Sequence, residues 1–314
     1  PSDYVADTSF DEMNLSDAVR RAVAEHGYTK PTPVQARTFR PVRDAAVWHA
    51  DVEAFDLVEG ERALGRIYLD MFPRDDKYKH YAQFTLANGK AGEVLPEGVL
   101  VCNFPRPGVE PALMEHSDVE TFFHEFGHLL HHTLGGHTRW AGISGVATEW
   151  DFVEAPSQML EEWVWRADTL QTFARHHQTG EPIPAELVER LARARRFNQG
   201  FEAVEYTACA LVDMALHART DADGVDITAF EAAELARIGM PPEIVMRHRL
   251  PQFGHLFASA AYAAGYYVYL WAEVLDADGH DAFVEAGDPF DREVAARLLR
   301  YVYASGATLE PAEA

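Results

Sequence analysis

The sequence predicts a mainly α-helical protein with one small antiparallel sheet. Between residues 61 and 105 the chain consists of short segments rich in aromatic and β-branched residues, such as "GVLVCNF", separated by turn residues such as Asn88-Gly89. This pattern is typical of short neighbouring strands. After Pro111, apolar residues recur at helical spacing. We therefore expect a helical body with a small sheet packed against it, formed by one large domain or two lobes.

The expected elements follow one another along the chain. The first helix covers 16–28, with Ser16 as its N-cap and Gly27 as its stop. The segment "KPTPVQ" then breaks the helix, and the strands of 61–105 follow. The later helices are expected at 117–134, 147–175, 184–218, 227–238, 258–276 and 291–304.

The charge of the chain argues against binding to polyanions. It has 50 acidic and 27 basic residues, which gives a net charge of -23. Nucleic acids and anionic lipids are bound through Lys and Arg, so we expect neither a nucleic-acid partner nor a membrane partner.

The sequence also predicts a cytoplasmic location. Cys102 and Cys209 are too few and too far apart for a disulfide framework, and the first ten residues do not resemble a signal peptide. The most apolar long run, 256–274, is rich in tyrosine, whose hydroxyls would need partners in lipid.

A motif for metal-dependent chemistry lies in "FHEFGHLLH", residues 123–131. On a helix, His124 and His128 are one turn apart and present both imidazoles to one point. Zinc accepts such a pair with one further ligand and an open position for water, and Glu125 is placed to take a proton from that water. Burying these groups among Phe and Leu without a metal would be costly, which favours a metal site.

The third ligand is not fixed by spacing. Residue 134 is Leu, so a third histidine six residues after His128 is excluded. A downstream carboxylate remains, and the candidates are Glu149, Asp151, Glu154, Glu161 and Glu162. We expect the last two to form a solvated face. We also expect at least two of His131, His132 and His137 to be solvated or structural.

Together with "DFVEAPSQMLEEWVW" (151–165), the motif resembles the thimet oligopeptidase family of zinc metallopeptidases. The resemblance implies a zincin-like (gluzincin) catalytic domain with one zinc per chain. It also implies that Glu154 completes the ligand set with His124 and His128, and that Glu125 is the general base.

A second matching block covers 253–278, "FGHLFASAAYAAGYYVYLWAEVLDAD". The resemblance implies that Tyr266 and Tyr269 stabilise the tetrahedral intermediate, and that His255 and Tyr262 bind substrate. The loop reads "ASAA" where the family is usually rich in glycine. For Tyr267 and Trp271 we expect core packing instead.

The resemblance covers about 46–305, the catalytic half of a family member, so we assign 46–314 to the catalytic domain. The preceding 1–45 resembles the adenine-sensing Q motif of DEAD-box RNA helicases, in which Phe10 and Gln35 would contact the nucleotide. Neither a phosphate loop nor a DEAD tetrapeptide occurs. We therefore expect a structural cap, with a nucleotide- or RNA-binding module as the weaker alternative.

These observations predict zinc-dependent hydrolysis of peptide bonds in oligopeptides. The alternative is a zinc-bound but inactive scaffold. Glu120, one turn before His124, is a candidate hydrogen-bond acceptor for a ligand histidine. Because the family's long N-terminal helical region is not in the sequence, we also expect exposed apolar surface and a homodimer.

Overall fold

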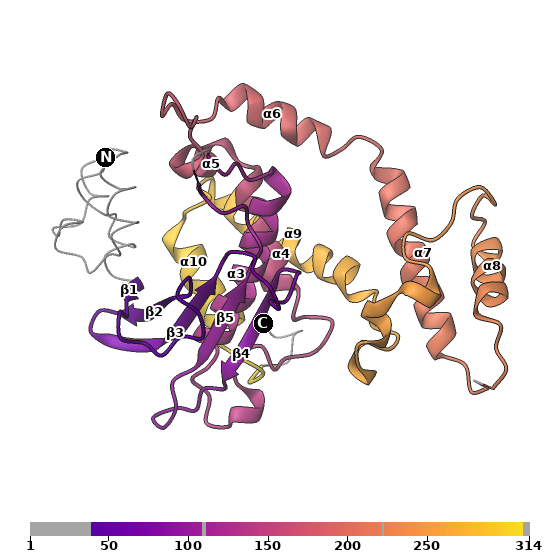
Figure 1. Ribbon diagram of the computed structural model, residues 1–314, viewed down its shortest axis with the longest axis horizontal. Helices are drawn as coiled ribbons and strands as arrows, with labels where there is room; N and C mark the ends of the chain where they lie inside the picture. Colours follow the sequence, from indigo (N-terminus) through magenta and orange to yellow (C-terminus); the bar gives the residue numbers. More distant parts are fainter. Residues whose placement is uncertain (1–38, 109–110, 222, 310–314) are drawn as a thin grey trace.

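The structure is a computed structural model that describes residues 39–108, 111–221 and 223–309 (Figure 1). The expected helix at 16–28 and the two expected nucleotide contacts, Phe10 and Gln35, lie outside the described residues. The assignment of 1–45 to a separate segment stays a prediction.

A five-stranded sheet forms one end of the molecule, with the strand order β1-β2-β3-β5-β4. The strands are β1 (Phe39–Pro41), β2 (Glu53–Glu59), β3 (Arg62–Asp70), β4 (Ala82–Ala87) and β5 (Glu97–Val101). The predicted sheet is confirmed, but its antiparallel character is wrong at one pair, because β3 and β5 run parallel. The chain passes from β3 to the edge strand β4, and β5 then inserts between these two strands. The sheet also begins earlier than residue 61.

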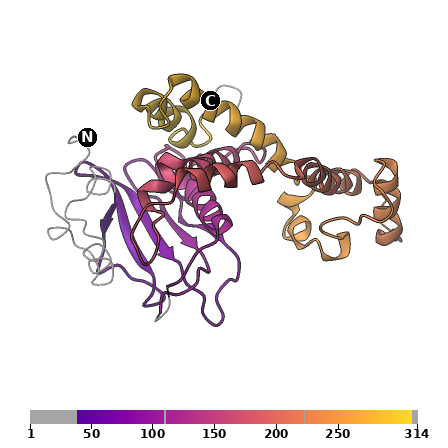
Figure 2. The same cartoon turned by 90° about the horizontal axis from the view of Figure 1, so that it is seen from above.

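The two faces of the sheet are covered differently. One face packs Ile67 and Leu100 against Leu129, Phe122 and Phe126 of helix α3 (His116–Leu134). The opposite face packs its buried residues under the segment that joins β1 to β2, through side chains such as Val42. Figure 2 shows the sheet at one end, with α3 lying along it. The long predicted helix at 117–134 is confirmed.

The remaining helices agree with the sequence pattern at 227–238 and 291–304, but elsewhere they are divided or displaced. They are α4 (Ala155–Glu161), α5 (Ala167–Phe173), α6 (Ala185–Ala194), α7 (Gln199–His217), α8 (Ile227–Arg237), α9 (Val268–Ala286) and α10 (Arg292–Leu298), which a π-helical turn (Leu299–Tyr303) extends. The single helix expected over 147–175 is interrupted at Arg166, whose backbone is extended. The helix expected over 184–218 is interrupted at Asn198, which has φ 61°. Asparagine adopts this left-handed conformation more easily than most residues.

The helix expected over 258–276 starts late. Residues Gly254–Phe257 and Ala260–Tyr262 form short 3-10 turns, and Ala264 has φ 57°. Only from Val268 onward does the chain continue as a regular helix. The segment before it is therefore a tightly turned loop that is held in place by the rest of the fold.

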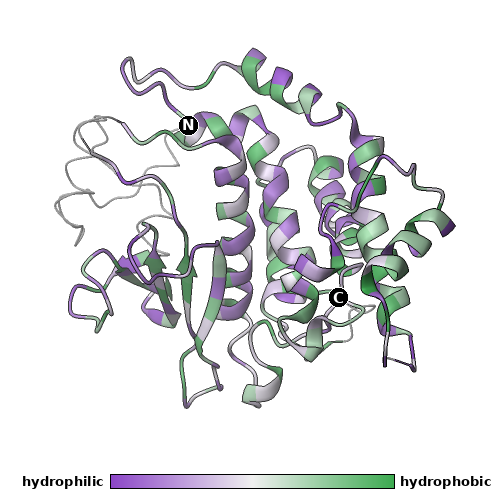
Figure 3. Ribbon diagram, turned by 45° about the vertical axis from the view of Figure 1, so that its right-hand side comes forward, coloured by the Kyte–Doolittle hydropathy of each residue, from purple (hydrophilic) through white to green (hydrophobic). Residues whose placement is uncertain are grey.

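Helices α3, α4 and α9 pack side by side, and α7 and α8 extend away from the sheet as an arm (Figures 1 and 2). The arm has its own core, in which Cys209 and Val212 of α7 meet Leu235 of α8 and Leu250 and Phe253 of the following loop. In Figure 3 apolar and polar residues follow one another along the helices, as in amphipathic helices. Among the described residues, no helix has the length and apolarity needed to cross a bilayer.

Candidate active site

Helix α3 fixes the two histidines of the motif. Its first turn is capped by Asp118, whose carboxylate accepts the backbone N–H of Glu115 at 3.0 Å. The fully buried Leu129 anchors the helix on the sheet. One turn apart on this helix, the His124 and His128 rings have centroids 4.9 Å apart. Both rings therefore face α4 and the turn before it.

Close approach of α4 depends on the glycine within the motif. A Cβ on Gly127 would lie only 2.6 Å from the Cα of Ser157. Glycine at this position lets the start of α4 pack directly on α3. Glu154, the residue immediately before α4, is thereby brought up to the histidines.

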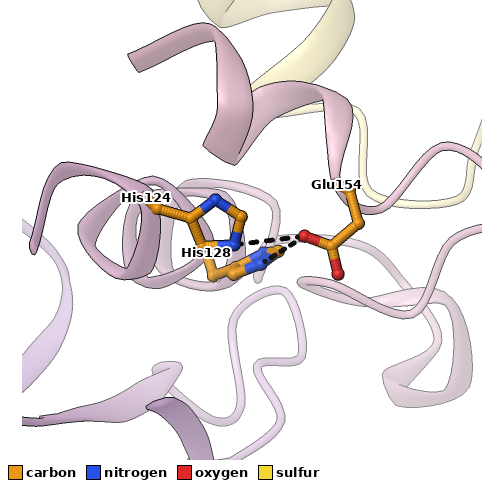
Figure 4. A group of neighbouring side chains, drawn as sticks. All are labelled: His124, His128 and Glu154. Atoms are coloured by element: carbon orange, nitrogen blue, oxygen red, sulfur yellow. Dashed lines mark hydrogen bonds and ion pairs between the residues drawn. The ribbon is translucent and has the colours of Figure 1, made fainter. Parts of the chain in front are cut away.

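His124, His128 and Glu154 form a compact group of metal-ligating atoms (Figure 4). The Nε2 atoms of the two histidines lie 3.2 and 3.1 Å from Oε2 of Glu154, and all three donor atoms lie within 4.8 Å of one another. Two imidazole nitrogens and one carboxylate oxygen match the donor set that a catalytic zinc takes. The residues present thus fit a metal with an open coordination position.

The charges of the group are strongly coupled. Burial by itself would raise the pKa of Glu154, but hydrogen bonds with both histidines hold that pKa well below its ordinary value. Burial would lower the pKa of His124, yet its bonds with Glu154 and Glu161 raise it to about 10. Two carboxylates, Glu154 and Glu161, therefore lie 3.2 and 2.6 Å from the nitrogens of His124, and their negative charge favours a bound cation.

Glu161 does not belong to a solvated face, and that expectation is wrong. Its Oε1 lies 2.6 Å from Nδ1 of His124, and its side chain is 22% exposed. Glu161 follows Glu154 by seven residues, two helical turns, and this spacing on one helix face was the available signal. Glu120 does not accept from a ligand histidine either, because its carboxylate accepts the indole N–H of Trp165 at 2.8 Å.

The other candidate carboxylates make contacts elsewhere. Glu162 pairs with Arg195 at 2.9 Å. Asp151 lies 3.3 Å from the hydroxyl of Tyr267, and Glu149 lies 3.1 Å from the hydroxyl of Thr148. Of the five carboxylates that spacing left open, Glu154 is the one in the described metal-ligating group.

Glu125 is held by the edge of the sheet. Its Oε2 accepts the backbone N–H of Gln83, in strand β4, at 2.7 Å. The carboxylate therefore lies on the side of α3 that faces the edge strand β4. This backbone donor gives Glu125 a fixed orientation that does not depend on another side chain.

The predicted substrate-side residues form one aromatic cluster. His255 has ring-centroid distances of 4.7, 5.4 and 5.9 Å to Tyr262, Tyr266 and Tyr269. Gln158 of α4 donates to the backbone carbonyl of Tyr269 at 3.2 Å, which ties the cluster to α4. Burial raises the pKa of Tyr269, and the negative charge of Glu154 raises it further.

The expectation that Tyr267 and Trp271 pack in the core is wrong. Trp271 is 53% exposed and Tyr267 is 37% exposed. The helical face of α9 that carries them points outward, because the cluster and α4 occupy the opposite face.

Comparison with known proteins identifies the family. The sequence model of peptidase family M3 matches residues 36–314. The chain belongs to peptidase family M3.

Three relatives illustrate the similarity. Oligopeptidase A of Escherichia coli is 38% identical over 287 residues, which is 87% of this chain and 41% of the relative. Dipeptidyl carboxypeptidase of Escherichia coli is 38% identical over 253 residues, 78% of this chain and 36% of the relative. Saccharolysin of Saccharomyces cerevisiae is 34% identical over 278 residues, 84% and 38% of the two chains. The chain thus spans well under half the length of these curated relatives.

Two residues that support the aromatic cluster of this M3 chain were missed by the sequence analysis. Asp213, fully buried in α7, accepts the backbone N–H groups of Ala264 and Tyr266 at 3.1 and 2.9 Å. Tyr206 stacks on Tyr266, with ring centroids 5.1 Å apart, and its hydroxyl donates to the carbonyl of that residue. A lone Asp within the apolar run "ACALVDMAL" was a usable signal for the first. No sequence pattern pointed to Tyr206.

The further histidines of the motif helix are structural. His131 and His132 are both fully buried. Nε2 of His132 lies 3.1 Å from the carbonyl oxygens of both Ala87 and Glu97, which joins α3 to the sheet. Burial lowers the pKa of His131 to about 3, so this imidazole is neutral. The expectation that at least two of the three extra histidines are solvated or structural is met by this pair.

Proposed function

We propose that this M3 chain hydrolyses peptide bonds in oligopeptides at a single zinc ion held by His124, His128 and Glu154. The observation that carries the proposal is the convergence of these three donors within 4.8 Å of one another, on a helix in which Glu125 directly follows the ligand His124. The fold we assign to it is the zincin-like, gluzincin type. Family membership supports the choice of peptide substrates.

Each residue of the site has a distinct part in the reaction. When bound, zinc acts as a Lewis acid that lowers the pKa of a water molecule and polarises the scissile carbonyl. Glu125 takes a proton from the attacking water and delivers it to the leaving amine. The oxygen of the water bonds to the carbonyl carbon, the C–N bond breaks, and the products are a carboxylate and an amine. The Gln83 N–H holds the Glu125 carboxylate in place during both transfers.

The tyrosines supply neutral hydrogen-bond donors. Burial raises the pKa of both Tyr266 and Tyr269, so their hydroxyls keep their protons at neutral pH. A protonated phenol can donate to the oxyanion that forms on the substrate carbonyl, and such donors act most strongly where water is excluded. His255 and Tyr262, which belong to the same aromatic cluster, are assigned to binding of the substrate.

The remaining expectations stay predictions: the cytoplasmic location, the absence of a nucleic-acid or membrane partner, and the homodimer. The homodimer has support in exposed apolar side chains on α9 and before α7, since Trp271 is 53% and Phe197 is 82% exposed. Light scattering at micromolar concentration tests it directly, and a monodisperse monomer would refute it.

The proposed function is tested by metal analysis together with hydrolysis of an internally quenched peptide. We expect about one zinc per chain after mild purification, as a three-ligand site implies. Glu125→Gln should retain zinc and fold but lose hydrolysis, while Glu154→Gln should lose zinc. Hydrolysis by Glu125→Gln at the wild-type rate would remove Glu125 from the mechanism, and metal-free protein that hydrolyses the peptide would overturn the whole proposal.

A further inference from the structure

Asp213 has a third partner besides the two backbone N–H groups of the loop. Nδ1 of His217, the last residue of α7, lies 2.7 Å from Oδ1 of Asp213 and 3.1 Å from the backbone carbonyl oxygen of the same residue. Both neighbouring atoms are acceptors, so Nδ1 carries a hydrogen and is the donor in both contacts. The side chain of His217 is 22% exposed and that of Asp213 is 1% exposed. The pair therefore runs from the surface of the arm into its interior.

His217 completes the hydrogen bonding of the buried carboxylate. Burying a carboxylate is costly unless its oxygens have donors. Oδ1 accepts from His217 at 2.7 Å and from the backbone N–H of Ala264 at 3.1 Å, while Oδ2 accepts the N–H of Tyr266 at 2.9 Å. Within the described part of the chain, His217 is the only ionisable hydrogen-bond partner of Asp213. Because the carboxylate is planar and rigid, the direction in which His217 holds Oδ1 also fixes the place of Oδ2.

The loop that Asp213 holds needs support from outside. Ala264 has φ 57°, in the left-handed region that a residue with a Cβ rarely adopts. On its other side the loop packs against the turn before Glu154, where the ring of Trp150 lies 4.8 Å from that of Tyr262. The loop is thus held between α7 and the segment that leads to a predicted metal ligand.

One face of α7 carries three residues that contact this loop. Tyr206, Asp213 and His217 follow one another at intervals of seven and four residues, which are two turns and one turn of the helix. Tyr206 stacks on Tyr266 and donates to its carbonyl. The ring of His217 lies 6.1 Å from that of Phe257, near the start of the loop. The face therefore supports the segment between Phe257 and Tyr266 at both ends.

We propose that His217 is a positioning residue for the reaction, which fixes the Asp213 carboxylate and through it the place of Tyr266 in the aromatic cluster. The inference rests on the proposed function, in which the hydroxyl of Tyr266 donates to the oxyanion. That hydrogen bond forms fully only in the transition state, so loss of His217 should change kcat rather than KM. A purely structural role, as a basic residue at the end of a helix, would change stability without this effect on kcat.

Two substitutions separate the hydrogen bond of His217 from its bulk. Asparagine carries an amide nitrogen on Cγ, where histidine carries Nδ1, whereas leucine has a similar branched shape and no donor. With the zinc-loaded chain and the internally quenched peptide, His217→Leu should lower kcat by about tenfold, the range for a hydrogen bond to a charged group. Its KM should stay within about twofold of the wild type. His217→Asn should restore kcat to within about threefold of the wild type.

Arg237→Gln is the matched control. Arg237 also lies in the last turn of a helix of the arm, α8, and it pairs with Glu234 of the same helix at 2.7 Å. It shares the charge at a helix end but not the link through Asp213, so kcat should stay at the wild-type value. A wild-type kcat in His217→Leu, an asparagine variant as slow as the leucine variant, or an equal loss in Arg237→Gln would overturn the inference.

The second arm of the test does not depend on turnover. Hydrogen exchange followed by mass spectrometry reports the protection of the Ala264 and Tyr266 N–H groups. Exchange there should be about tenfold faster in His217→Leu and near the wild-type rate in His217→Asn, while peptides from α8 should exchange equally in both. Unchanged exchange of the loop in His217→Leu would overturn the inference.

The two arms also separate this inference from the proposed function. Absence of Glu125-dependent hydrolysis in a chain whose loop exchange responds as expected refutes the proposed function but not the positioning of the loop by His217. Urea denaturation establishes that each variant is folded. Should His217→Leu not fold, His217→Ala takes its place with the same expected results, because the smaller side chain lets water reach the Asp213 carboxylate.

Discussion

The carboxylate of Glu161 lies 2.6 Å from Nδ1 of His124, on the side of the ring opposite the Nε2 atom that faces Glu154. A hydrogen bond at Nδ1 fixes both the orientation and the tautomer of the imidazole, and it makes the other nitrogen a better ligand. Helix α4 thus supplies two carboxylates to one histidine, Glu154 just before its start and Glu161 at its end.

We predict that Glu161→Gln weakens zinc binding by about 10- to 100-fold, the usual cost of losing such a partner. Competition with a chromophoric chelator measures this affinity. Glu162→Gln is the matched control, because its carboxylate pairs with Arg195 instead and should leave zinc affinity within error of the wild type. Equal affinities for the two variants would mean that Glu161 does not orient His124.

Gly127→Ala should both destabilise the protein and weaken zinc binding. The added Cβ would lie 2.6 Å from the Cα of Ser157, a backbone atom that can move only with α4 and therefore with Glu154. Overpacking of this kind costs about 1–3 kcal/mol in the free energy of unfolding, measured by urea denaturation. Gly200→Ala in α7 serves as control, since open space surrounds its Cβ position, and it should be neutral or stabilising.

Tyr269→Phe should lower kcat by about 10²-fold or more with zinc content unchanged, because one donor to the oxyanion is removed. Tyr267→Phe provides the comparison two residues away. Its hydroxyl lies 3.3 Å from Asp151 on an exposed surface, so its kcat should stay near that of the wild type. An unaffected kcat in Tyr269→Phe would reduce that tyrosine to a packing role.

Asp213→Asn should lower kcat by about tenfold, equivalent to about 1.4 kcal/mol of activation free energy. An amide can keep only one of the two backbone acceptor bonds, so the loop from Ala264 to Tyr266 loses its fixed position. Asp221→Asn, past the end of α7, is the charge-matched control. The result that would contradict this prediction is a kcat equal to that of the control.

The stability of the protein should fall as pH rises from about 4 to about 8 through one buried carboxyl. Burial, aided by the charges of Glu162, Glu161 and Glu273, raises the pKa of Asp276 to about 8. A folded-state pKa above the unfolded value of about 3.9 means that this group's contribution is full below pH 4 and is lost as pH rises through 8.

Asp276→Asn removes that loss and should therefore gain stability relative to the wild type as the pH rises. At pH 9 the gain should be about 1 kcal/mol or more in the free energy of unfolding. Asp278→Asn, exposed on the same helix, should change stability by less than about 0.5 kcal/mol at any pH. Parallel pH profiles for wild type and Asp276→Asn would contradict the assignment of the raised pKa.

The sequence by itself determined the features that depend on residues close together in the chain. The four-residue spacing of His124 and His128, with apolar residues between and around them, specifies both a helix and a pair of ligands on one face. The motif around Glu154 selected the third ligand through its resemblance to a family, since spacing alone left five carboxylates open.

Only the tertiary structure decided the features that depend on distant segments. After β3 the chain first forms the edge strand β4, and β5 then inserts between the two, parallel to β3. No local sequence pattern predicts this strand order. Glu161 reaches His124 across 37 residues, and Asp213 reaches Tyr266 across 53. A carboxylate on an amphipathic helix has the same sequence neighbours whether it faces water or a buried imidazole. The two cases differ only in the partner residue, which comes into contact when the helices pack.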